Sequence, residues 1–153
     1  MDDEDEEVRI KDALSRISEA ERNGDYKPIN EKLLKKRLKW YEDNKDRLNL
    51  RGSDVRKAYA LLIVEYLGLG PMEAPILFES ESKIVWGSYN RCPVLEACIR
   101  GHYDTREICK RGWEQSVQAL IEKINPDLLF SRNYNTLRPY GDYCEEAIEI
   151  RGR

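Results

Sequence analysis

The spacing of apolar residues changes near Gly70, and this change constrains the fold more than any other feature of the chain. Before Gly70, apolar residues recur three and four positions apart, which is typical of helices that bury one face. After it, short runs alternate between apolar and polar residues, as in strands with one buried face. We therefore predict an α+β fold of one compact domain, with a helical N-terminal part over residues 1–69 and a cysteine-containing α+β part over residues 70–153.

Three helices are expected in the N-terminal part. The first carries an apolar stripe from Ile10 to Ile17 and should end near Gly24. The second should cover residues 30–48, with its lysine-rich run as a solvated face. The third should begin at an N-cap, Ser53, and end before Gly68. The predicted buried positions of the second helix are Leu34, Leu38 and Tyr41.

Four antiparallel strands are expected after Gly70. The runs "APILFES" and "KIVWGSY" are apolar or β-branched and flank a polar stretch, which predicts a hairpin. Residues 128–135 and 144–150 alternate and predict two further strands. Together these runs indicate an antiparallel sheet with helices packed against it.

Two more helices should lie between the hairpin and the last strands. Pro93 suits the first position of a short helix, and Gly101 suits its end. A longer, continuous helix is expected over residues 104–124. Its start is predicted at Asp104, because Asp104 and Glu107 have the spacing of a capping box.

The last strand contains a glutamate that should point inward. Side chains two positions apart share a face of a strand, so Cys144, Glu146 and Ile148 should all face the core. A buried carboxylate needs a cation or hydrogen-bond donors. Arg132 on the neighbouring strand is the first candidate and Arg138 the second. The pattern leaves open whether this is a structural ion pair or part of a ligand site.

Cys92 directly precedes Pro93 and should therefore be the N-cap of the short helix. Backbone amides and the helix dipole at an N-cap favour a thiolate, which is the reactive form of cysteine. Lone cysteines, on the other hand, are often small buried hydrophobic residues. Both interpretations of Cys92 remain open from the sequence.

The four cysteines follow the spacing C-x5-C-x10-C-x34-C. This spacing lacks the close C-x2-C pairs of zinc ribbons and ferredoxins. Three of them lie near predicted helix starts or first turns and one near a strand start, so they could converge and bind zinc or iron. His102, the only histidine, is expected on a surface loop. The alternative metal ligands are Cys92, Cys98, Cys109 and Cys144, with Asp104, Glu107 or Asp142 as possible oxygen ligands.

Composition and missing motifs narrow the function further. A net charge of −3 and a pI near 5.4 argue against a general nucleic-acid binder, which would show a basic face. No apolar run approaches the length of a membrane span. The acidic start lacks the organisation of a signal peptide, so a cytoplasmic location with reduced cysteines is expected. No glycine pattern of a nucleotide site is present, and no nucleotide cofactor is expected.

Four motifs resemble those of a known family. "WGSYNRCPVLEAC", "DTREIC", "FSRNYNTLRP" and "GDYCEE" lie between residues 84 and 150. They resemble a group of archaeal and bacterial proteins that is similar to the L-2-amino-thiazoline-4-carboxylic acid hydrolase family. The last motif is also similar to one that closes the small-ligand 4-vinyl reductase domains, which are α+β sensor and carrier modules. The matching residues are Cys92, Pro93, Cys109, Arg132, Gly141, Asp142, Cys144 and Glu145.

The resemblance implies hydrolytic opening of a small cyclic amidine-like acid, or capture of a small ligand. Our leading hypothesis is a hydrolase-like protein that acts on a C–N or C–S bond of a small acid through a cysteine. The candidate roles are nucleophile for Cys92 or Cys144, proton transfer for Glu146 or Asp142, and carboxylate binding for Arg132 or Arg138.

Two alternatives to the hydrolase remain. The chain could be a non-catalytic metal- or small-ligand-binding module that acts as a sensor or carrier, or a structural protein whose cysteines pack the core. In each case the expected partner is a small molecule rather than a nucleic acid or a membrane. The N-terminal helices could also provide the contact of a homodimer.

Overall fold

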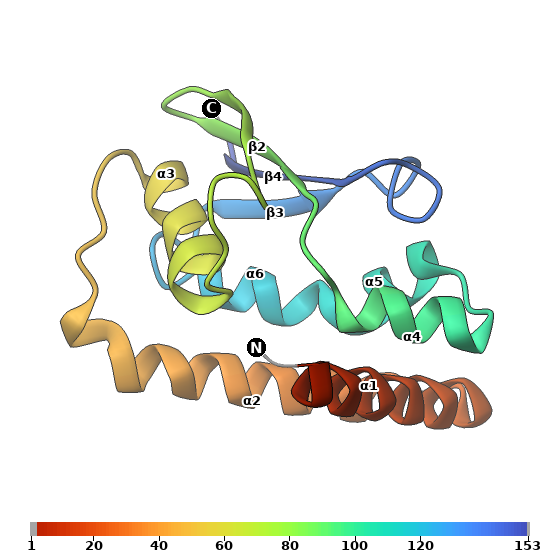
Figure 1. The fold of residues 1–153 in the computed structure, drawn as a ribbon. Helices are drawn as coiled ribbons and strands as arrows, with labels where there is room; N and C mark the ends of the chain where they lie inside the picture. The colour runs from red at the N-terminus through yellow and green to blue at the C-terminus, as the bar shows by residue number, and fades with distance from the viewer. Residues whose placement is uncertain (1–2, 153) are drawn as a thin grey trace.

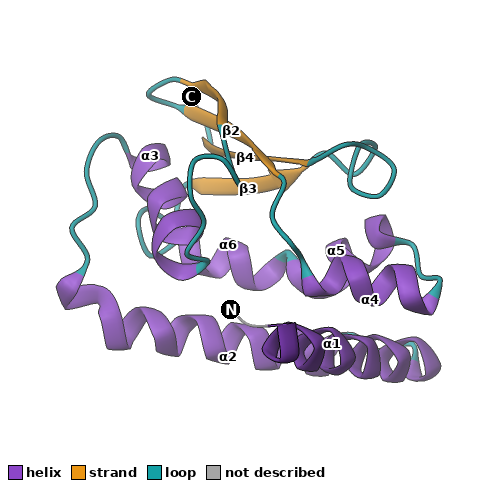
Figure 2. Cartoon of the chain, viewed as in Figure 1, coloured by secondary structure: helices purple, strands orange, loops and turns teal. Residues whose placement is uncertain are grey.

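A four-stranded antiparallel sheet forms one side of the computed structural model, which describes residues 3–152 (Figure 1). The strands are β1 (Ile76–Glu79), β2 (Lys83–Ser88), β3 (Leu128–Arg132) and β4 (Cys144–Ile150), in the order β1-β2-β4-β3. The predicted hairpin and both later strands are therefore confirmed, as is the α+β class. The helices, purple in Figure 2, all lie on the same side of the sheet.

The helices form two layers beneath the sheet (Figure 1). The helices next to the sheet are α3 (Asp54–Tyr59) with its continuation η2 (Ala60–Tyr66), α4 (Pro93–Gly101), α5 (Thr105–Trp113) and α6 (Gln115–Ile121). The outer layer holds α1 (Asp3–Asn23) and α2 (Lys27–Asn44), which ends in the short 3₁₀ turn η1 (Lys45–Arg47). Long side chains of α2 can therefore reach the sheet only past the middle layer.

The apolar stripe predicted for the first helix is buried against α4. Ile10, Ala13 and Ile17 are all buried within the chain. A β-carbon at Gly101 would come within 2.6 Å of the Tyr103 ring, so glycine allows the end of α4 to pack closely. The stripe is thus used inside the chain, and the expected homodimer contact through these helices stays a prediction.

Two of the predicted helix starts are confirmed by their caps, whereas α2 begins at Lys27 and not at the predicted Asn30. The Ser53 hydroxyl accepts a hydrogen bond from the Arg56 amide at 3.3 Å. The Asp104 carboxylate accepts one from the Arg106 amide at 2.9 Å and caps α5, without the predicted involvement of Glu107. The chain beyond α3 differs from the prediction, because η2 is a π-helix. Its wider turns accompany the burial of three consecutive residues: Leu61, Leu62 and Ile63.

The buried face of α2 differs from the predicted one. Leu34, Leu38 and Tyr41 are only half-buried, whereas Ile29 and Arg37 are buried. α2 packs against α5 and α6, and the residues that face them follow the spacing Ile29, Leu33, Arg37. A charged residue therefore occupies a position on the apolar face, which the interpretation of a solvated basic helix did not anticipate.

The helix predicted over residues 104–124 is broken at Glu114, between α5 and α6. The Glu114 carboxylate accepts a hydrogen bond from the Tyr134 hydroxyl, and the Trp113 carbonyl accepts one from Arg132 Nη1 at 3.4 Å. These contacts come from β3 and the segment that follows it. Tertiary hydrogen bonds thus replace helical ones at this point, and local sequence gave no sign of them.

Two apolar clusters form the core. One joins the inner face of the sheet to α3, η2 and α6 and includes Trp86 and Ile148. The other joins α1 and α2 to α4 and α5 and includes Ile17 and Cys98. Each cluster draws residues from both sides of Gly70. The change in pattern there therefore marks a change of secondary structure inside shared cores.

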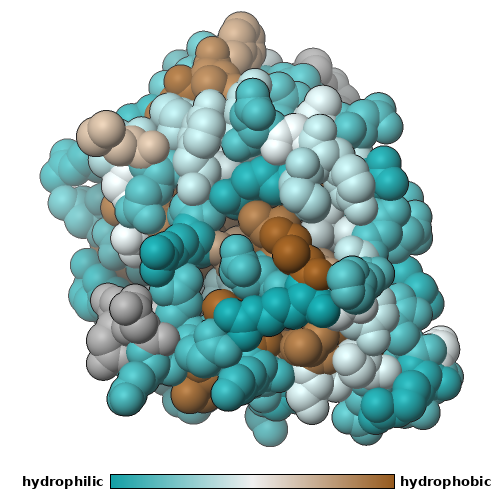
Figure 3. Space-filling model, turned by 45° about the vertical axis from the view of Figure 1, so that its right-hand side comes forward, coloured by the Kyte–Doolittle hydropathy of each residue, from teal (hydrophilic) through white to brown (hydrophobic). Residues whose placement is uncertain are grey.

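Hydrophilic residues predominate on the face of the molecule shown in Figure 3, where apolar residues form small separate patches. Among the helices within residues 3–152, none is both long and apolar enough to cross a membrane.

Candidate functional site

The inner face of β4 carries the side chains that the alternation predicted. Glu146 is 9% exposed and lies on the same face as Ile148 and Ile150, which are also buried. Glu145, on the opposite face, is half-buried. Glu146 pairs across the sheet with Trp86 on β2 and Arg132 on β3. The predicted strand register is confirmed.

Glu146 is held by two donors inside the protein. Arg132 Nε lies 3.0 Å from Glu146 Oε2, and the Ser88 hydroxyl donates to Oε1 at 2.7 Å. Burial is the largest single effect and disfavours the charged guanidinium, but Glu146, Cys109 and Tyr134 together outweigh it and raise the pKa of Arg132. Both carboxylate oxygens are occupied, so the geometry is that of a structural ion pair.

Arg132 has its remaining contacts within the chain as well. Its guanidinium carbon lies 4.8 Å from the centre of the Phe130 ring, and Nη1 donates to the Trp113 carbonyl. To bind a substrate carboxylate, as predicted, Arg132 would have to break these contacts within the protein. Arg132 is better placed to position β3 against the helix break.

Arg138 lies against the thiol of Cys144. Arg138 Nε donates to Cys144 Sγ at 3.2 Å, and Nη1 donates to the Asn90 carbonyl at 2.7 Å. The hydroxyl of buried Thr105, in the first turn of α5, holds the Arg138 carbonyl at 2.6 Å. The guanidinium is therefore fixed from two sides, with one nitrogen directed at sulfur.

Two glycines, Gly141 in the loop between β3 and β4 and Gly87 in β2, allow close approaches around this loop. A β-carbon at Gly141 would collide with the carbonyl oxygen of Thr136. A β-carbon at Gly87 would come within 2.8 Å of the Tyr143 ring, which packs against β2 at that point. Arg138 lies in this loop and Cys144 begins β4, so the contact between them closes over six residues of chain.

Cys92 is the N-cap of α4, as predicted. The backbone amides of Leu95 and Val94 and the Arg138 guanidinium favour a thiolate. Burial has the larger effect and raises the pKa of Cys92. Of the two interpretations of Cys92 that the sequence left open, burial therefore favours the protonated thiol.

The four cysteines converge, as the positions of the helix and strand starts suggested. The pKa of Cys109 is raised by burial to about 12, with smaller contributions from Cys92, Cys98 and Cys144. Burial likewise raises the pKa of Cys98 to about 12. All four thiols are free of disulfides. Cysteines that lie up to 52 positions apart in the sequence, as Cys92 and Cys144 do, thus come together in one region.

The convergence does not form a metal-binding geometry in the described part of the chain. Within residues 3–152, no group of three or more histidine, cysteine, aspartate or glutamate side chains is arranged to hold a metal ion. Asp104 is engaged with Arg106, while Asp142 and Glu107 are exposed. His102 is exposed at the end of α4, as expected. The fold therefore brings the four thiols of the metal-site alternative near one another, but it does not arrange them as metal ligands.

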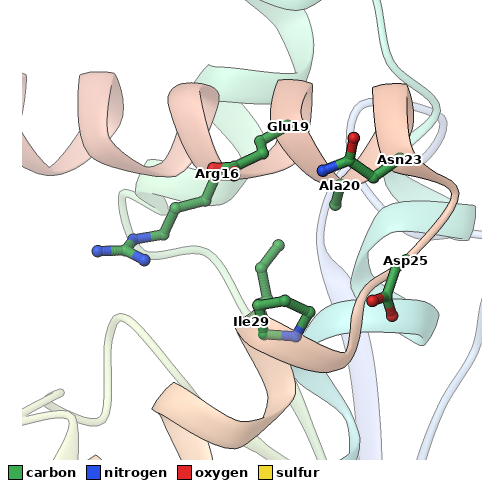
Figure 4. A pocket seen from close by; sticks show the side chains of 7 residues that line it. Arg16, Glu19, Ala20, Asn23, Asp25 and Ile29 are labelled. Atoms are coloured by element: carbon green, nitrogen blue, oxygen red, sulfur yellow. The ribbon is translucent and has the colours of Figure 1, made fainter.

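Two hollows lie on the surface away from the thiols. One lies where α1 turns into α2, between Arg16, Asn23 and Asp25 (Figure 4), and none of the predicted site residues lines it. The other lies along β2, β3 and β4, beside Ser131, Glu145 and Ala147, and is bordered by Arg132 and Glu146.

The raised pKa of Cys98 gives the stability of the protein an alkaline dependence. Cys98 is fully buried, and an unfolded thiol ionises near pH 8.5, whereas the folded one keeps its proton until about pH 12. The unfolded state alone releases this proton, so the stabilisation is complete below pH 8.5 and is lost as pH rises towards 12. We expect a loss of about 2 kcal/mol in the free energy of unfolding between pH 8 and pH 10.

Urea unfolding of the wild type and of Cys98→Ala at pH 8 and pH 10 measures this loss of stability. Between pH 8 and pH 10, the free energy of unfolding of Cys98→Ala should fall by about 2 kcal/mol less than that of the wild type. Identical pH slopes in the two proteins would mean that Cys98 does not titrate as its burial requires.

Comparisons of the chain with protein-family models, curated proteins and solved structures found no match. The site therefore has to be interpreted from its own geometry.

Two residues in the region were missed by the sequence reasoning. Arg37 is buried beneath the sheet, and Trp86 is fully buried beside Glu146. The spacing of Arg37 from Ile29 and Leu33 was a usable signal, since all three fall on one helical face. Trp86 had no signal beyond its place in an apolar strand.

Proposed function

We propose that the chain is a hydrolase-like protein that acts on a C–N or C–S bond of a small cyclic amidine or amide acid, with Cys144 as its nucleophile. The observation that carries the proposal is the hydrogen bond from Arg138 Nε to Cys144 Sγ at 3.2 Å. A cation that donates to sulfur is typical of the surroundings of reactive cysteines. The substrate class comes from the resemblance of the "GDYCEE" and Cys-Pro motifs.

The reaction would have two steps. Cys144 Sγ would add to the electrophilic carbon, and the C–N or C–S bond would break as the leaving atom takes up a proton. Water would then cleave the new C–S bond and return the thiol. Glu146 has both oxygens engaged, so Asp142, which is exposed two positions before Cys144, is the carboxylate better suited to move protons. Arg138 Nη2 has no acceptor among the described residues and is the donor we assign to the substrate carboxylate.

Replacing Cys144 with serine tests the proposal. Screened against small thiazoline, amidine and amide acids, the wild type should hydrolyse at least one, and Cys144→Ser should lose at least about 100-fold in kcat. The melting temperature should stay close to that of the wild type, since Cys144 is only half-buried. Cys98→Ser is the matched control and should retain kcat. Equal activity of Cys144→Ser and the wild type would exclude Cys144 as nucleophile.

The convergence of four thiols supports a second candidate, a non-catalytic module that binds a thiophilic metal or a small ligand. Metal binding would have to draw the thiols together, because they are not arranged as a ligand set without it. Elemental analysis of protein purified without chelators distinguishes the candidates. Near-stoichiometric zinc or iron that is lost in Cys92→Ser and Cys109→Ser would favour the module over the hydrolase.

A further inference from the structure

Two buried N–H groups beneath the sheet lack an acceptor. Arg37 is 9% exposed and donates through Nη1 to the Ser116 hydroxyl at 2.8 Å, but its Nε has no partner within the described residues. Trp86 is fully buried, and its Nε1 has no partner there either. Each unpaired donor is costly in the interior, so an acceptor is expected beside it.

Both donors lie around the Arg132–Glu146 ion pair. Trp86 and Arg132 are the two cross-strand neighbours of Glu146. The Trp86 ring lies 6.3 Å from the Phe130 ring, over which the Arg132 guanidinium stacks. The charges of Arg132 and Glu146 act on Arg37 from the sheet side. Arg37 on α2 and Trp86 on β2 thus each lie near this ion pair.

Arg37 lies at the break between α5 and α6. Its partner Ser116 lies in the first turn of α6, and its guanidinium carbon lies 5.4 Å from the centre of the Tyr66 ring at the end of the π-helix η2. Four of the five buried polar side chains of the described chain belong to this region: Arg37, Ser88, Ser116 and Glu146. Helix irregularities of this kind recur at functional sites.

The region carries more positive charge than it can pair. Arg37 and Arg132 contribute two guanidinium groups, and Glu146 is the carboxylate that acts on both. The two oxygens of Glu146 are already taken by Arg132 and Ser88. Burial lowers the pKa of Arg37, and the opposing effects of Tyr66 and Glu146 are too small to offset it. A buried cation without a full counter-charge is destabilising, and a bound anion would relieve that cost.

We infer that Arg37 Nε and Trp86 Nε1 bind a small planar oxyanion, of the carboxylate class, between the sheet and the α5–α6 break. A carboxylate offers two acceptor oxygens in one plane, which suits the planar guanidinium of arginine and leaves an oxygen for the indole N–H. Its charge would compensate Arg37. This site does not depend on Cys144 or on the hydrolase proposed above.

Nuclear magnetic resonance of the ¹⁵N-labelled full chain tests the inference at one of the two donors. The chain has three tryptophans and should give three indole N–H signals, of which Trp86→Phe identifies one. Sodium formate is the probe, with sodium chloride at equal ionic strength as the control. We expect formate to shift the Trp86 signal saturably. Chloride should not do so, and neither should formate with Arg37→Met.

The variants make each outcome decisive. Arg37→Met removes the buried charge and should raise the melting temperature of the ligand-free chain, while formate raises it only in the wild type. If Arg37→Met does not fold, Arg37→Lys keeps the charge without the Nε donor and must also lose the saturable shift. Cys144→Ser must retain it, which separates this site from the nucleophile. No response of the wild type to formate, or an equal response to chloride, would overturn the inference and leave buried water as the acceptor.

Discussion

Replacing Glu146 with alanine is expected to lower the free energy of unfolding by about 3–5 kcal/mol. The side chains of Arg132 and Glu146 are 13% and 11% exposed, so the change would leave a buried guanidinium without its carboxylate. The Ser88 hydroxyl would also lose its acceptor. Urea unfolding at pH 7 measures the loss directly.

Glu145→Ala is the matched control for this prediction. Glu145 is adjacent in sequence but lies on the other face of β4, with one long hydrogen bond of 3.4 Å from Asn133. Its loss should cost less than about 1 kcal/mol. The double variant Arg132→Met/Glu146→Leu should recover most of the stability lost in Glu146→Ala, because no unpaired charge remains. Equal losses for Glu145→Ala and Glu146→Ala would contradict the strand register.

Gly141→Ala is expected to destabilise the protein by about 3 kcal/mol, the upper end of the range for overpacking. The added β-carbon would collide with backbone, the carbonyl of Thr136, which cannot move aside as a side chain can. Relief requires the loop between β3 and β4 to change shape, and this loop carries Arg138. The contact between Arg138 and Cys144 should therefore be lost together with stability.

Gly70→Ala provides the control, since a β-carbon at Gly70 would meet no atom within 4 Å. Its effect should be neutral, or stabilising by about 0.5 kcal/mol through a less flexible unfolded chain. Thermal unfolding of the two variants compares the effects. A Gly141→Ala protein as stable as Gly70→Ala would show that the loop does not need its tight turn.

The features that the sequence predicted well depend on local patterns. The alternation from Cys144 to Ile150 was sufficient to predict that Glu146 points inward, because one register error would have buried Glu145 and Glu149 instead. The N-caps at Ser53 and Asp104 were likewise predictable, because capping depends on residues within one turn.

The features that the sequence did not reveal depend on contacts between distant segments. Cys92 has the local position of an activated thiol, but its burial depends on how α4 docks, and burial decides its pKa. The helix break at Glu114 is set by Tyr134 and Arg132, about 20 residues further along the chain. Arg37 belongs to a run of basic residues in the sequence, and its burial depends on the packing of α5 and α6 against α2.

The most direct test of the central claim, that Cys144 is the reactive thiol, is site-resolved alkylation. The folded chain would be treated with iodoacetamide at pH 7.5, and modification of each cysteine followed by mass spectrometry. Burial raises the pKa of Cys92, Cys98 and Cys109, whereas the Cys144 thiol accepts a hydrogen bond from Arg138 Nε. We predict that Cys144 reacts at least about 10-fold faster than the others and that Arg138→Met removes most of this difference. Faster reaction of Cys92, or protection of all four thiols until a chelator is added, would contradict the account.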